Sequence, residues 1–243
     1  FFCVLNLWEN KIVVYLPQII NKLSVMIFKR KIYDKILQWK RENNGKTALL
    51  IEGARRIGKS TIVEEFGKKE YKSYILIDFN KTSEEVKKLF DNLMDLDYIF
   101  LFLQTVYKTK LEERNSLIIF DEVQKCPNAR QAIKYLVQDG RYDYIETGSL
   151  ISIRKNVESI TIPSEEDRIS MYPMDYEEFC WAIDDNMTFP FIRKFWEEKK
   201  SLGDMHREMM RRFRLYMLVG GMPQAVVAYI ETNNFNDVDV AKR

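Results

Sequence analysis

Short apolar runs alternate with amphipathic segments along the chain as far as Pro173. The apolar runs predict strands at 47–52, 74–79, 117–120, 144–147 and 169–172. Apolar residues at helical spacing predict helices at 28–40, 59–68, 83–94, 98–107 and 128–137. Strands that are apolar throughout and alternate with helices are typical of an α/β fold, in which helices cover both faces of a parallel sheet.

Beyond Pro173 the pattern predicts helices alone. Their expected positions are 175–183, 191–199, 204–218 and 224–231. We therefore expect two parts, a sheet-containing core over 26–174 and a helical part over 175–243.

The predicted helix at 204–218 carries two distinct faces. Met205, Met209 and Phe213 fall at helical spacing, which predicts that they lie in the core. The basic residues on another face are Arg207, Arg211 and Arg214. A solvated basic face and a contact with DNA or a partner subunit are both open for them.

The stretch 1–25 differs from the charged sequence that follows it. It begins with Phe1, and Glu9 and Lys11 interrupt its apolar residues, so it matches neither a signal peptide nor a membrane-spanning helix of roughly 20 residues. We expect a non-native upstream extension with the native start at Met26. The alternative is a peripheral helix.

The charge and cysteine content exclude several classes of function. With 38 Lys and Arg against 36 Asp and Glu, the net charge of +2 gives no global attraction to nucleic acid or to an anionic membrane. Three widely spaced cysteines and a single histidine support neither a disulfide framework nor a zinc site. A reducing, cytoplasmic location is expected, with no membrane partner.

A phosphate-binding motif connects the first predicted strand to the next helix. The residues at 53–60 fit G-x-x-x-x-G-K-[ST] and are Gly53, Ala54, Arg55, Arg56, Ile57, Gly58, Lys59 and Ser60. We expect their main-chain amides and the positive end of the helix dipole to hold a triphosphate. Lys59 then reaches the β- and γ-phosphates, Ser60 binds Mg²⁺, and Thr61 flanks the α-phosphate. A plain glycine turn before a helix is the weaker alternative.

An acidic pair follows the third predicted strand. The four apolar residues at 117–120 bring Asp121 to the carboxyl end of the strand, where it can hold Mg²⁺ together with Ser60. Glu122 can then polarise a water for attack on the γ-phosphate. The pair favours hydrolysis over transfer to an acceptor, the alternative being an ordinary surface loop.

Further candidates lie near the ends of the last two predicted strands. Thr147 and Ser149 could sense the γ-phosphate, or they could simply belong to a strand-ending turn. Arg168 could act as an arginine finger on the nucleotide of a neighbouring subunit, or it could be a solvated surface arginine.

Several segments, taken in order, resemble the AAA-type ATPases of bacteria and archaea that carry a C-terminal DUF4143 region. They are FKRKIYDKILQW, LLIEGARRIGKST, IIFDEVQ, IETGS, MYPMDYEEF and GGMPQAV. The resemblance implies an ASCE-type, three-layer P-loop sheet with a C-terminal helical lid, ATP and Mg²⁺ as ligands, and the same roles for Lys59, Ser60, Asp121 and Glu122. The family continues well past its GG-x-P turn, so the chain is expected to be truncated at its C-terminus.

The predicted activity is therefore Mg²⁺-dependent ATP hydrolysis coupled to movement of the helical lid. One alternative is a nucleotide-dependent switch that regulates DNA or a partner with negligible turnover, and another is a P-loop kinase. A homo-oligomer is expected if Arg168 acts on a neighbouring subunit.

Overall fold

The computed structural model describes residues 26–149 and 165–243, so the expectation for 1–25 lies outside the described residues, as does most of the loop before the last predicted strand. A five-stranded parallel sheet has the order β2-β3-β4-β1-β5. The strands are β1 (Ala48–Gly53), β2 (Ser73–Asp78), β3 (Ser116–Asp121), β4 (Asp143–Ser149) and β5 (Glu166–Met171). The predicted α/β fold with a parallel P-loop sheet is confirmed.

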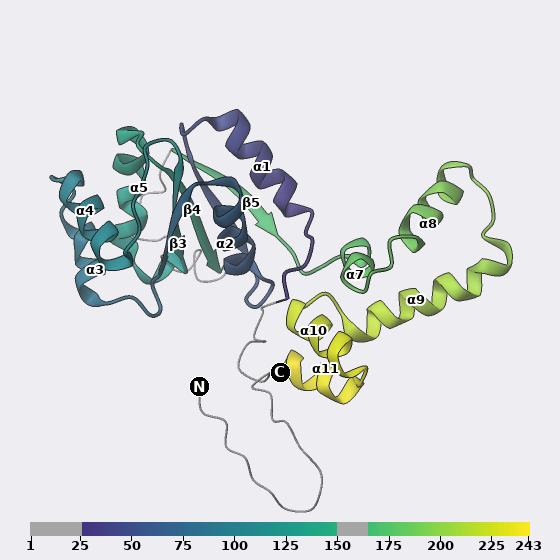
Figure 1. Cartoon of the computed structure of the whole chain (residues 1–243). Coiled ribbons are helices and arrows are strands. Elements are labelled where there is room, and N and C mark those ends of the chain that lie inside the picture. The colour runs from purple at the N-terminus through teal and green to yellow at the C-terminus, as the bar shows by residue number, and fades with distance from the viewer. Residues whose placement is uncertain (1–25, 150–164) are drawn as a thin grey trace, which may run out of the picture.

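Helices cover both faces of this sheet (Figure 1). One face packs against α1 (Ile32–Asn43) and α2 (Lys59–Glu70). The other packs against α3 (Glu84–Lys88), α4 (Leu96–Tyr107) and α5 (Pro127–Asp139). Because side chains alternate along a strand, Leu49 and Leu50 enter opposite cores.

The core on the α5 face is rich in aromatic side chains. Phe90 and Phe120 meet edge to face with ring centroids 5.3 Å apart, and Phe79 packs at 5.7 Å from Phe120. Each fully buried side chain of this size contributes roughly 1.5–3 kcal/mol. The sheet is therefore a stable platform for the loops at its carboxyl edge.

Among the helix boundaries that differ from the prediction, two matter most for the sheet part. The helix expected at 28–40 begins only at Ile32 and continues to Asn43, and no regular secondary structure precedes it at 26–30. The helix expected at 83–94 ends at Lys88 and tightens into a 3₁₀ turn, Leu89–Asp91, whose Leu89 and Phe90 are buried in the core. Tertiary packing decides both ends.

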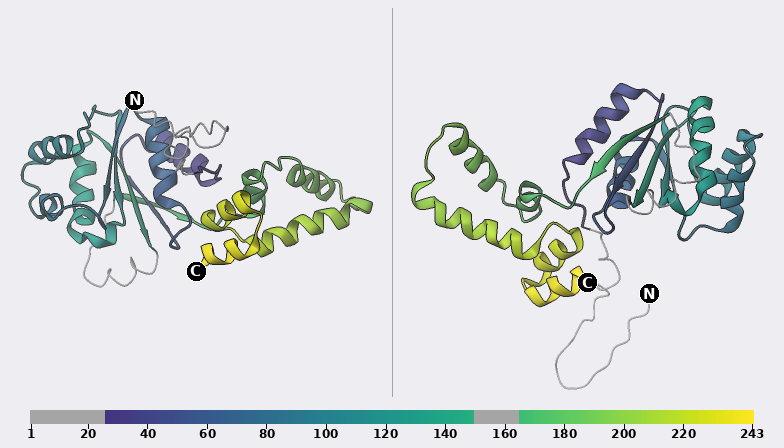
Figure 2. Two further views of the ribbon diagram at one scale, coloured as in Figure 1. Left: turned by 60° about the horizontal axis from the view of Figure 1, so that its bottom comes forward. Right: turned by 180° about the vertical axis from the view of Figure 1, so that it is seen from behind.

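The C-terminal part is helical, as expected. Its helices are α7 (Tyr176–Ala182), α8 (Thr188–Glu197), α9 (His206–Val219), α10 (Pro223–Thr232) and α11 (Phe235–Lys242), with a 3₁₀ turn at Gly203–Met205. In Figures 1 and 2, α8 and α9 form an arm that extends away from the sheet, whereas α10 and α11 lie at the end of this arm that is nearer the sheet. The sequence did not predict α11, because Val238 is its single buried residue.

The expectation that one face of the 204–218 helix is buried is only partly right. Met209 is buried, but Met205 is 43% and Phe213 37% exposed. The reason is that α9 runs out along the arm, where few elements can cover it (Figure 2). Of the basic residues, Arg211 pairs with Glu208 at 2.8 Å.

Across residues 26–149 and 165–243, we find no single helix with the length and apolar character needed to cross a membrane. The bent pair Gly203–Val219 and Pro223–Thr232, whose axes differ by 116°, meets both criteria only when taken together.

Candidate functional site

The phosphate-loop motif lies where β1 ends and α2 begins, between β4 and β5. Gly53 approaches the neighbouring strand so closely that a Cβ there would lie 2.3 Å from the Met171 carbonyl oxygen. Gly58 (φ 91°) and Arg56 (φ 62°) are left-handed. The first turn of α2 has neither a side-chain cap nor an acidic residue, which leaves its amides to hold an anion.

The Lys59 side chain lies across this loop. Its Nζ donates to the carbonyl oxygens of Ala54 (2.7 Å) and Gly53 (3.2 Å), and the side chain is buried. Burial lowers the pKa of Lys59, while the Glu122 and Asp121 carboxylates act in the opposite direction. The amine is thus placed between the loop carbonyls and the acidic pair.

The structure joins the acidic pair to the phosphate loop. Ser60 Oγ donates to Asp121 Oδ1 at 2.7 Å, although the strands that carry the two motifs are separated by β4. That intervening strand carries Thr147, whose hydroxyl donates to the same Asp121 oxygen and accepts the Glu122 amide at 3.3 Å. Burial raises the pKa of Asp121, and the hydrogen bonds from Thr147 and Ser60 partly offset the rise.

Glu122 adopts a left-handed conformation (φ 55°) at the end of β3. Its Oε2 accepts a hydrogen bond from Gln124 Nε2. Gln124 was not among the predicted site residues, although it belongs to the IIFDEVQ segment. It orients the carboxylate that was predicted to act on water.

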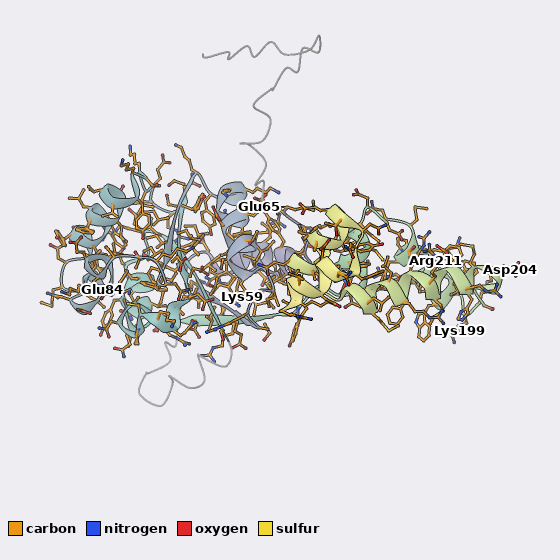
Figure 3. The ribbon with its side chains drawn as sticks, turned by 90° about the horizontal axis from the view of Figure 1, so that it is seen from below. Lys59, Glu65, Glu84, Lys199, Asp204 and Arg211 are labelled. Atoms are coloured by element: carbon orange, nitrogen blue, oxygen red, sulfur yellow. The ribbon has the colours of Figure 1, made fainter. Side chains whose placement is uncertain are left out.

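A pocket of about 570 Å³ opens beside the loop. The segments that line it are the phosphate loop with the start of α2, the stretch before α1, α10, and Glu122 after β3. The lining side chains outside the phosphate loop and α2 are Met26, Ile27, Phe28, Arg30, Glu122, Pro223, Gln224, Val227 and Glu231. Figure 3 shows Lys59 near the middle of the molecule, where the sheet meets the C-terminal helices. Sequence reasoning did not assign the contribution of α10 or of 26–30.

The residues present fit a magnesium nucleotide. A hydroxyl and a carboxylate oxygen, those of Ser60 and Asp121, meet at the carboxyl edge of the sheet, and Mg²⁺ prefers such oxygen ligands. The uncapped start of α2 suits phosphate, and the pocket is within the usual size range for a small-molecule site.

Arg168 and Ser149, both predicted site residues, do not line the pocket. Arg168, on β5, pairs with Glu166 at 2.7 Å and does not line this pocket, so it cannot be assigned to the nucleotide of its own chain. Ser149 is buried and pairs with Gly53, the first residue of the phosphate loop, in the β1–β4 register. Arg55 is exposed, and its charge contributes to the lowered pKa of Lys59.

The chain matches the model of one protein family, and its likeness to solved structures is distant. The family model AAA_14, described as an AAA domain, matches residues 45–180, more than half of the chain. No curated protein matches. Similar solved structures include C. elegans PCH-2 (12% identity, TM-score 0.39, covering 86% of this chain and 63% of that one). The Aeropyrum pernix ORC1 protein in complex with DNA is also similar (11% identity, TM-score 0.46, covering 89% and 65%). The chain thus spans less than two thirds of each. By its family match, the chain belongs to the AAA_14 family of AAA domains.

Proposed function

We propose that this chain binds ATP with Mg²⁺ and hydrolyses it. The observation that carries the proposal is the hydrogen bond between Ser60 and Asp121, because it unites the phosphate loop and the acidic pair in one site. A phosphate loop alone suits many nucleotide-binding proteins, whereas an adjoining carboxylate pair suits attack by water.

Each side chain has a distinct role in this mechanism. Lys59 and the α2 amides bind the phosphates, and Ser60 and Asp121 would hold Mg²⁺, which when bound neutralises charge on the phosphate oxygens. Glu122 accepts a proton from water, and Gln124 orients its carboxylate. Thr147 donates a hydrogen bond to Asp121 and would sense the γ-phosphate through it.

The pocket lining supports a coupling between the nucleotide and the helical part. Phe28 and Val227 supply apolar surface suited to a base, and Gln224 and Glu231 supply polar groups. Pro223 Cγ lies only 3.6 Å from the position a Cβ would take at Gly58. Nucleotide bound here would contact both parts of the molecule, so its hydrolysis would move α10 against the sheet.

The experiment is to measure Mg²⁺-ATP affinity and phosphate release without an added acceptor. Glu122→Gln is expected to retain affinity and to lower kcat by about 10²-fold or more, since general-base catalysis contributes this much. The control is Glu84→Gln, an exposed residue far from Lys59 in Figure 3, which should change neither quantity. Binding with negligible wild-type turnover would indicate the switch instead. Formation of ADP that requires an acceptor and releases no free phosphate, because the phosphoryl group is transferred to that acceptor, would indicate a kinase.

Assembly into a homo-oligomer, with Arg168 acting on the nucleotide of a neighbouring subunit, is part of the proposal. The Arg168 side chain is partly exposed on β5, where a second copy could reach it. Mixing Arg168→Ala with Lys59→Ala chains tests the idea, because each retains what the other lacks. Activity of the mixture above the sum of the separate samples supports it, and simple additivity opposes it.

A further inference from the structure

Arg30 joins the phosphate loop to two points that lie more than 100 residues further along the chain, Tyr172 and Glu178. Its Nη1 donates to the Ile57 carbonyl at 2.9 Å, and its Nη2 donates to the Tyr172 carbonyl at 2.7 Å. Its Nε lies 3.2 Å from Glu178 Oε2. Both charged side chains are only 6% exposed. A single guanidinium therefore contacts the phosphate loop, the end of β5 and helix α7.

The contact with Ile57 falls at the most constrained point of the loop. Ile57 lies between Arg56 and Gly58, which both have positive φ. The C=O and N–H of a trans peptide point in opposite directions, so holding the Ile57 carbonyl also fixes the direction of the Gly58 N–H. Phosphate loops bind through main-chain N–H groups. Arg30 can therefore set the loop geometry without touching a phosphate.

Glu178, the ion-pair partner of Arg30, is itself held by main-chain amides. Glu178 Oε1 accepts the Lys31 amide at 2.7 Å, and Glu178 Oε2 accepts the Asp175 amide at 3.1 Å, which completes the capping box of α7. Arg30 Nε forms no hydrogen bond with a described residue, so the link to Glu178 is an ion pair; separating it is costly, because each buried charge would be left uncompensated. A displacement of α7 would therefore also displace the Arg30 side chain.

We propose that Arg30 is a positioning residue that holds the phosphate loop in its binding conformation and ties that conformation to α7. Its consequence for ATP rests on the proposed function, whereas its effect on the loop does not. Weakening the contact at either end loosens the loop, so Glu178 influences nucleotide affinity from outside the pocket.

The chain offers a matched control at the next residue. Lys31 crosses the same junction, with Nζ 2.6 Å from Asp175 and 2.7 Å from Glu177, yet its side chain has no bond to the phosphate loop. If the junction matters only for stability, Lys31 and Arg30 variants should behave alike. If Arg30 positions the loop, they should differ.

The first measurement is amide hydrogen exchange over 53–61 in the nucleotide-free protein. Arg30→Gln and Glu178→Gln are expected to speed exchange there about tenfold, equal to 1.4 kcal/mol of local opening, while Lys31→Gln leaves it unchanged. Glu178→Gln keeps one side-chain oxygen, which can accept the Asp175 amide of the capping box, and it loses the acceptor for the Lys31 amide. Circular dichroism checks that α7 still forms in this variant. Arg30→Lys retains the charge but not the three-way geometry, and it is expected to rescue little.

The second measurement is Mg²⁺-ATP affinity across the cycle of Arg30→Gln, Glu178→Gln and the double variant. Each single change should weaken binding about tenfold, and the double variant should be scarcely weaker than Arg30→Gln alone.

Two results overturn the inference. One is an unchanged rate of amide exchange over 53–61 in a folded Arg30→Gln protein. The other is a loss of ATP affinity in the double variant that equals the sum of the two single losses in free energy. If Arg30→Gln does not fold, unchanged exchange in Glu178→Gln has the same force. If the wild type binds no ATP while the exchange pattern holds, the proposed function fails and the positioning role stands.

Discussion

The sheet and the helical part of this molecule differ sharply in how much of each is buried. Every residue of β3 and β4 is buried, and two large clusters fill both faces of the sheet. The core of the helical part has six buried residues, and α8 contributes only Thr188 to the interior. Sparse packing lowers the cost of local movement. The phosphate loop thus lies on the densely packed part, and the pocket beside it is completed by α10 of the sparsely packed part.

Replacing Lys59 tests whether nucleotide binding depends on the phosphate loop, and we expect it to have the largest effect on binding. Lys59→Met should lower Mg²⁺-ATP affinity roughly 100-fold or more, since hydrogen bonds to charged groups are worth about 1.5–3 kcal/mol each. Titration with a fluorescent ATP analogue measures it. Lys69→Met, which removes an exposed lysine from the same helix, is the control. A loss of comparable size in Lys69→Met would place the effect in α2 stability rather than in the site.

One core truncation in each part tests whether the two parts unfold together. Phe120→Ala should lower the free energy of unfolding by about 3–5 kcal/mol. Val226→Ala, in the core of the helical part, should cost about 2 kcal/mol, because it removes two methylene equivalents from a fully buried side chain. Urea unfolding followed by circular dichroism provides both values. If the two parts unfold independently, Val226→Ala should also split the unfolding curve, with the helical part unfolding at a lower urea concentration than the sheet part. A single coincident transition in both variants would contradict that.

The smallest effect concerns an unusual carboxyl group inside the platform. Glu146 is fully buried on β4, and neither of its carboxylate oxygens has a hydrogen-bond partner in the described part of the chain. Burial, reinforced by Glu166, raises its pKa well above the ordinary 4.5, while Arg130 and Arg168 oppose the rise. Between the two pKa values, Glu146 is protonated in the folded protein and ionised in the unfolded chain.

The sign of the effect follows from this difference in proton binding. As pH rises above about 4.5, the unfolded state loses the Glu146 proton first, so the wild-type free energy of unfolding falls. Glu146→Gln should remove that fall, so its stability relative to wild type should increase with pH, by up to about 1.4 kcal/mol for each pH unit between the unfolded and the folded pKa of Glu146. Denaturation at a series of pH values measures it, with the exposed Glu85→Gln as control. Parallel curves for wild type and Glu146→Gln would contradict the prediction.

Sequence reasoning succeeded where the signal is local. The apolar runs located all five described strands to within about three residues. The signal is clearest where a strand is buried on both faces, as β3 is, and weakest for the edge strand β5, which begins three residues before its predicted start and has a single buried residue. The G-x-x-x-x-G-K-S spacing identified Lys59 and Ser60, and the end of an apolar strand identified Asp121. Local patterns failed for α11 and for the start of α1, which depend on packing partners far along the chain.

By itself, the sequence determined the alternation of strands and helices, the phosphate loop and the acidic pair, because each depends on neighbouring residues. Only the tertiary structure decided that Thr147 bridges Asp121 to the Glu122 amide, that Pro223 abuts the phosphate loop, and that Arg30 spans from Ile57 to Glu178. These contacts join segments up to about 170 residues apart, and no periodicity records them. They arise when strand order and helix packing bring the segments together, and the coupling proposed here depends on them.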